Sequence, residues 1–120
     1  MDDRVTGIGG IFFKAKNKDR MIAWYREHLG VDVQDWGGAT FTSDGPTTWT
    51  VFKQDSKYFG PGEQRYMINY RVPNLAGILA RLRAAGVTVD PHTEESEFGK
   101  FGWIVDPEGN RIELWEQTGG

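Results

Sequence analysis

The sequence predicts two copies of one supersecondary pattern, in which a strand is followed by an amphipathic helix and then by short strands. Each expected helix begins after an asparagine, Asn17 or Asn74, and ends at a Gly-Val-x-Val motif, at residues 30–33 or 86–89. Such a repeat decides the fold, because one copy cannot bury a sheet face alone and the two must pack together. We therefore expect an α+β fold of two βαβββ modules, whose curved mixed sheet leaves a concave ligand site.

The two modules divide a single domain that spans residues 1–120. Module one covers about residues 5–54 and module two about residues 66–118, and a linker at about 55–65 joins them. The linker contains Tyr-Phe-Gly-Pro-Gly and interrupts the periodicity, so it is either a simple connection or a cover for the pocket. Strands are expected near residues 7–16, 31–36, 39–43 and 47–53 in module one, and near 66–72, 87–91, 100–105 and 110–116 in module two.

Composition excludes several classes of function. The chain has no Cys, which rules out disulfides, thiol catalysis and iron–sulfur clusters. It carries 17 acidic against 14 basic residues, a balance that does not attract nucleic acid. No apolar run is long enough for a membrane span and the first residues are charged, so we expect a cytoplasmic protein without a membrane partner. Five Trp, four Tyr and seven Phe either fill the core or line a cavity for a flat or apolar ligand.

Two segments carry a family resemblance. Residues 23–30 read Ala-Trp-Tyr-Arg-Glu-His-Leu-Gly, and residues 104–116 read Ile-Val-Asp-Pro-Glu-Gly-Asn-Arg-Ile-Glu-Leu-Trp-Glu. Both resemble segments of the vicinal oxygen chelate superfamily, which contains glyoxalase I, extradiol dioxygenases, fosfomycin-resistance enzymes and bleomycin-resistance proteins. The resemblance covers nearly the whole chain and implies the duplicated fold described above. It also implies a homodimer, since members of this size commonly complete the concavity with a partner subunit.

The resemblance also implies where a metal would bind. Metal-using members take ligands from one position on the first strand and one on the last strand of each module, and these positions match Gly10, Thr50, Met67 and Glu113. Only Glu113 has a suitable side chain, because glycine offers no donor and a thioether is a poor ligand for hard or borderline ions. We therefore expect no cofactor and no tight metal site. Members without the ligand set, such as bleomycin-binding proteins, hold an aromatic or cationic molecule between rings and carboxylates.

Residues that share a strand face with these four positions should line the concavity, since side chains alternate along a strand. Glu113 is the only candidate catalytic residue, as a general base. Lys14, Arg71 and Arg111 either fix an anionic group together or pair with Glu113 and nearby acids. The expected ligand-binding residues are Phe12, Lys14, Thr50, Phe52, Met67, Asn69, Arg71, Trp103, Arg111, Glu113 and Trp115.

Three functions remain open at this point. The leading hypothesis is a protein that binds a small aromatic or charged molecule without a tight metal site. The alternative is a metal-dependent glyoxalase, lyase or dioxygenase that uses Glu113 with ligands from other positions. The third is a regulatory or immunity module with a filled concavity, whose exposed aromatic residues contact another protein. His28 is expected to pack at its helix end and His92 to lie in a solvated loop, before an acidic run at residues 94–97.

Overall fold

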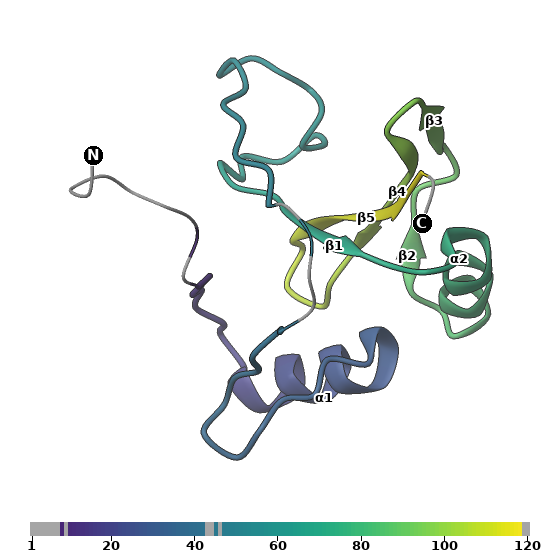
Figure 1. Cartoon of the computed structure of the whole chain (residues 1–120). Coiled ribbons are helices and arrows are strands. Elements are labelled where there is room, and N and C mark those ends of the chain that lie inside the picture. The colour runs from purple at the N-terminus through teal and green to yellow at the C-terminus, as the bar shows by residue number, and fades with distance from the viewer. Residues whose placement is uncertain (1–7, 9, 43–44, 46, 119–120) are drawn as a thin grey trace.

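The computed structural model describes residue 8, residues 10–42, residue 45 and residues 47–118. Its five strands form one sheet with the order β1-β5-β4-β2, and β3 also pairs with β4 (Figure 1). β1 runs parallel to β5, and the other pairs are antiparallel. This mixed sheet with two helices confirms the expected α+β fold class. The elements are α1 (Lys18–Leu29), β1 (Ile68–Arg71), α2 (Leu75–Ala84), β2 (Thr88–Val89), β3 (Glu94–Ser96), β4 (Gly99–Val105) and β5 (Arg111–Gln117).

Both helices begin where the sequence predicts. The side chain of Asn17 accepts a hydrogen bond from the backbone N–H three residues on, and Asn74 does the same for α2. These caps satisfy backbone donors that have no partner within a helix. α1 ends at Gly30, whose φ of 64° lies in the left-handed region that glycine adopts without strain. Neither helix is long and apolar enough to cross a membrane, in the part of the chain that the structure describes.

The core lies between the two helices and one face of the sheet. Gly102 on β4 makes the close approach of α2 possible, because a Cβ at this position would lie 2.9 Å from Leu79 Cδ1. Neighbouring side chains on a strand point to opposite faces, so Trp103 and Glu113 lie on the face away from the helices. The buried core consists of Met21, Tyr25, Leu75, Leu79, Leu82, Ile104, Ile112 and Leu114.

The turn between β4 and β5 attaches α1 to the second half of the chain. Asp106 is only 4% exposed and accepts a 2.8 Å hydrogen bond from the Tyr25 hydroxyl. The Glu108 carboxylate accepts 2.7 and 2.8 Å hydrogen bonds from the backbone N–H groups of Lys16 and Asn17. An acceptor with negative charge is favourable at a helix N-terminus, and these bonds hold the pKa of Glu108 below its ordinary value.

The first half of the chain differs from the sequence prediction. The expected strands at 31–36, 39–43 and 47–53 are absent from the described residues, as is the strand at 7–16 in the positions that can be assessed. Residues 7, 9 and 43 of these ranges lie outside the described residues. A strand needs a hydrogen-bonded neighbour, and no ladder forms in the described residues before β1. Large apolar side chains there are exposed, including Phe12 (95%) and Trp49 (76%).

Candidate functional site

Three side chains from adjacent strands meet on the face of the sheet that points away from the helices. The strand register places Asn69 of β1 and Trp103 of β4 on either side of Glu113 on β5. Asn69 Nδ2 donates a 2.7 Å hydrogen bond to Glu113 Oε1, and Trp103 Nε1 donates a 3.0 Å hydrogen bond to Oε2. Glu113 is 6% exposed, so these bonds compensate for part of the hydration that its carboxylate loses.

A third donor comes from the linker. The hydroxyl of Tyr58 donates a hydrogen bond to Glu113 Oε2, the oxygen that Trp103 also contacts. Burial and this hydrogen bond raise the pKa of Tyr58 above its ordinary value, so the phenol stays protonated and donates at neutral pH. We call Tyr58, Asn69, Trp103 and Glu113 the Glu113 cluster.

Aromatic rings surround the Glu113 cluster. The Tyr58 ring meets the Trp103 ring edge-on, with 5.6 Å between centroids and an interplanar angle of 89°. On its other side Tyr58 stacks on Phe52, with centroids 5.2 Å apart. The His92 ring lies parallel to Trp103 at 6.0 Å. The site therefore combines one carboxylate with ring faces and edges, an arrangement that suits an aromatic or cationic ligand.

Arg111 lies beside the Glu113 cluster, but its guanidinium pairs with other groups. The Arg111 guanidinium lies 5.2 Å from the centroid of the Trp103 ring, and its Nη1 is 3.2 Å from Asp90 Oδ2. The backbone N–H of His92, together with this guanidinium, holds the pKa of Asp90 below its ordinary value. None of the ion pairs that join described residues includes Glu113. All three donors to the Glu113 carboxylate are thus uncharged.

The structure brings together some of the expected lining residues and separates others. Asn69, Trp103, Arg111 and Glu113 lie together, and Phe52 joins them through Tyr58. Trp115 follows Glu113 on the same face of β5. Its ring stacks on Phe101, and its Nε1 donates a hydrogen bond to the Phe98 carbonyl. Met67 precedes β1, and Arg71 at the end of β1 lies opposite Trp115. Phe12, Lys14 and Thr50 are exposed, and no hydrogen bond, ion pair or ring contact among the described residues joins them to the Glu113 cluster.

Tyr58 and Gln64 are not among the site residues expected from the sequence. Both lie in the linker, whose interrupted periodicity was the available signal. The Gln64 side chain accepts a 2.8 Å hydrogen bond from the Arg111 N–H and donates a 3.1 Å bond to the Arg111 carbonyl. Contacts of this kind depend on the path of a loop, which periodicity does not predict.

The donor set around Glu113 does not fit a metal ion. A carboxylate whose oxygens accept from Tyr58, Asn69 and Trp103 is surrounded by N–H and O–H donors, which do not coordinate a cation while they donate. Within the described ranges, no group of three or more His, Asp or Glu residues could hold a metal ion. Gly10, Thr50 and Met67 add no carboxylate or imidazole ligand to this set.

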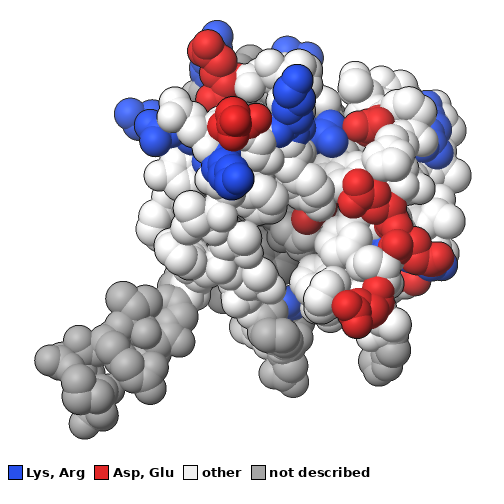
Figure 2. Space-filling model, turned by 90° about the horizontal axis from the view of Figure 1, so that it is seen from above, with Lys and Arg blue, Asp and Glu red and all other residues white. Residues whose placement is uncertain are grey.

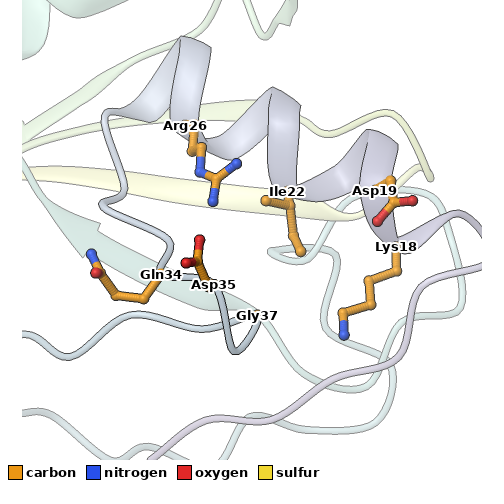
Figure 3. Close-up of a pocket in the computed structure, with 7 residues that line it drawn as sticks. All are labelled: Lys18, Asp19, Ile22, Arg26, Gln34, Asp35 and Gly37. Atoms are coloured by element: carbon orange, nitrogen blue, oxygen red, sulfur yellow. The ribbon is translucent and has the colours of Figure 1, made fainter.

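Two cavities lie away from this cluster. The larger, about 390 Å³, opens between α1 and the following loop and is lined mainly by polar side chains, together with Ile22. In Figure 3, Arg26 and Asp35 point toward one another across it, and Lys18 and Asp19 lie toward the start of the helix. Arg26 donates to the Val33 carbonyl and so ties the loop to α1. The smaller cavity, about 70 Å³, lies between Leu29, Phe41 and the core. Neither cavity is lined by Glu113.

Solved structures with a similar fold include an antibiotic-binding protein and an enzyme. TnmS3, an antibiotic-binding protein from a Streptomyces species, aligns with a TM-score of 0.56 and 20% identity over 86% of this chain and 88% of its own. The trypanothione-dependent glyoxalase I of Leishmania major aligns with a TM-score of 0.50 and 26% identity, over 82% of this chain and 77% of its own. A protein of unknown function from Agrobacterium tumefaciens aligns with a TM-score of 0.58 and 20% identity, over 92% and 97%.

The family assignment rests on the match to a family model. No curated protein sequence matches the chain. The model of the glyoxalase-like domain matches residues 10–115, which is most of the chain. Together with the sheet and helices described above, this match confirms the resemblance that the two sequence segments indicate. The chain belongs to the glyoxalase-like domain family, within the vicinal oxygen chelate superfamily.

Proposed function

We propose that the protein binds a small molecule, aromatic and carrying a positive charge, at the Glu113 cluster, without a tight metal site. One observation carries this proposal: a nearly buried carboxylate accepts hydrogen bonds from three uncharged donors, and no ion pair of the described residues compensates for its charge. A buried negative charge of this kind favours a ligand that supplies a positive group.

The surroundings of the cluster favour the same ligand chemistry. A cation is attracted to the faces of Trp and Tyr rings, and Tyr58 and Trp103, whose polar edges bond Glu113, bring two such rings to the site. Figure 2, which views the molecule from above, shows acidic side chains gathered on the side where β3 lies, and Glu94 and Glu95 belong to that strand. Glu94 is close enough to contribute to the raised pKa of Tyr58. A local excess of negative charge raises the rate at which cations arrive.

The similar structures are compatible with this proposal. TnmS3 has the same fold and is an antibiotic-binding protein, so the fold can serve binding. The expectation of no metal cofactor stays part of the proposal, supported by the N–H and O–H donors around Glu113. Elemental analysis of protein purified without chelators tests it. A stoichiometric divalent ion that is lost in Glu113→Gln would instead favour a metal-dependent glyoxalase, lyase or dioxygenase.

Binding is tested by isothermal titration with three probes of one shape. Benzylamine carries an aromatic ring and a cation, benzyl alcohol is its neutral counterpart, and benzoate is an anion. We expect benzylamine to bind best, and Glu113→Gln to weaken its binding by about tenfold or more, because a charge-assisted hydrogen bond is lost. Asp32→Asn removes the same charge from an exposed position and serves as the matched control. Equal affinity of wild type and Glu113→Gln for benzylamine would refute the proposal.

The substitution Glu113→Gln should leave the fold intact. A glutamine can keep an oxygen facing Tyr58 and Trp103, and Asn69 can rotate its amide so that its oxygen accepts from the new NH₂ group. We expect circular dichroism and the melting temperature to stay close to wild type. Unfolding of Glu113→Gln would make Glu113 a structural residue and remove the basis of the proposed site.

We also propose that the protein is a cytoplasmic homodimer. Phe12, Trp49 and Val51 are exposed in segments that the sequence predicts as strands, and a second copy could bury these side chains across an isologous interface. Light scattering coupled to size-exclusion chromatography should give twice the mass of one chain. Trp49→Glu should reduce that mass to one chain while the α-helical signal remains. Cell fractionation tests the location.

A further inference from the structure

The linker is attached to the strand that carries Glu113. Besides the two bonds from the Gln64 side chain to the Arg111 backbone, the Arg111 Nε donates a 3.3 Å hydrogen bond to the Tyr58 carbonyl. Gly60 lies so close to Arg111 that a Cβ would be 2.8 Å from Arg111 Cδ, and its φ of 88° suits glycine alone. In Figure 1 the linker belongs to the teal loop beside the end of the sheet where β5 begins. The linker thus has a defined position over the start of β5.

Within this attached segment, the Tyr58 side chain takes the place that a ligand would need. Its hydroxyl bonds Glu113 Oε2, and its ring lies between those of Phe52 and Trp103. Trp103 is 2% exposed and Glu113 is 6% exposed, so solvent hardly reaches either. A molecule that bonds Glu113 must therefore displace a group that is already there, and Tyr58 is the one donor of the cluster that comes from a loop rather than from the sheet.

We propose that Tyr58 occludes the binding site, because its hydroxyl competes with the ligand for Glu113 and only a stronger donor displaces it. This inference rests on the proposed function. A neutral hydroxyl ligand gains nothing from the exchange, since it replaces one O–H donor with another. An ammonium or amidinium group gains, since its positive charge adds an electrostatic attraction to the carboxylate that the neutral phenol does not supply. The bonds at Gln64 keep one end of the linker in place, and displacement of the Tyr58 hydroxyl leaves the other end held by the 3.3 Å bond from Arg111 Nε to the Tyr58 carbonyl.

Titration of Tyr58→Phe with benzylamine and benzyl alcohol tests the competition. Phenylalanine keeps the ring between Phe52 and Trp103 and removes only the competing donor. We expect both probes to bind more tightly to Tyr58→Phe than to wild type, by about tenfold, because neither has to displace a hydrogen bond to a charged group. Benzyl alcohol, which we expect wild type to bind too weakly to measure, should become measurable. Unchanged or weaker binding of benzylamine would overturn the inference and make Tyr58 part of the binding surface.

A second measurement needs no ligand. The Tyr58 N–H donates to Ser56 Oγ at 3.2 Å, and the Gly60 N–H donates to the Lys57 carbonyl at 3.0 Å. If the hydroxyl holds the linker closed, Tyr58→Phe should speed amide hydrogen exchange at residues 56–60 and leave β4 and β5 unchanged.

Tyr66→Phe is the matched control for this exchange measurement, because Tyr66 lies beyond the linker and is 87% exposed. Unchanged exchange in Tyr58→Phe would overturn the inference even where benzylamine binds. Conversely, failure of benzylamine to bind both wild type and Tyr58→Phe would refute the proposed function for this probe, while faster exchange would still show that the hydroxyl closes the linker.

Discussion

The hydrogen bond between Tyr25 and Asp106 makes the clearest prediction about stability. Tyr25 is 7% exposed on α1, and its hydroxyl is 2.8 Å from Asp106 Oδ2. Burial and the Asp106 charge raise the pKa of Tyr25, so the phenol is a permanent donor at neutral pH. The bond joins the helix of the first half to the final hairpin, across 81 positions of the sequence. Tyr25→Phe removes this bond and keeps the ring.

The expected loss follows from what remains around Asp106. Asn110 Nδ2 still donates to the same oxygen at 2.8 Å, and the backbone N–H groups of Glu108 and Asn110 still donate to the other oxygen. The carboxylate is therefore not left without partners. A hydrogen bond to a charged group contributes about 1.5–3 kcal/mol, and we expect the lower end, about 1.5–2 kcal/mol.

Urea denaturation followed by circular dichroism measures this loss. With a slope of about 1–3 kcal/mol per molar urea, as small proteins show, the midpoint should fall by roughly 1 M. Tyr66→Phe is the control, because that side chain is 87% exposed, and its effect should stay within about 0.5 kcal/mol. A loss in Tyr25→Phe no larger than that of the control would refute the reasoning and show that the hairpin holds Asp106 without help from α1.

Two further outcomes follow from the same core. Burial, together with the charge of Asp106, raises the pKa of Tyr70 from 10.0 to about 12, so its contribution to stability is complete below pH 10.0 and is lost as the pH rises toward 12. As the pH rises over this interval, the urea midpoint of Tyr70→Phe should therefore fall less than that of wild type. An equal fall in both proteins would show that Tyr70 does not cause this pH dependence. Gly102→Ala places a Cβ 2.9 Å from Leu79 Cδ1 and should lower the unfolding free energy by about 1–3 kcal/mol. Gly62→Ala meets no atom within 4 Å and is the control, so equal thermal shifts for the two variants would show that the core relaxes at no cost.

The sequence predicted those parts of the fold that depend on local chemistry. Asn17 and Asn74 begin the helices because an amide oxygen there satisfies backbone donors, whatever the rest of the chain does. The strands expected at 100–105 and 110–116 are observed as β4 and β5 within a residue at each end, and the intervening turn is as predicted. Alternation along β5 places Ile112 and Leu114 in the core beneath the helices and Glu113 on the opposite face.

Contacts between distant segments could not be predicted in this way. β3 lies in an acidic run that composition assigns to solvated surface, and it forms because β4 offers an edge for pairing. The segments at 31–36, 39–43 and 47–53 have the composition of strands, yet a strand exists only when a second segment forms a hydrogen-bonded ladder with it, and among the described residues no such ladder forms there. Strand pairing depends on two segments, so the residues of one segment do not determine it.

The candidate site shows the same division. The sequence by itself determined the α+β fold class, the family, and a single carboxylate, Glu113, on the last strand, because periodicity and motifs are local. Only the tertiary structure decided which groups surround that carboxylate: Asn69 and Trp103 through strand register, and Tyr58 through the path of the linker. Register and loop path follow from the packing of the whole chain, whose free energy is summed over contacts between residues far apart in sequence.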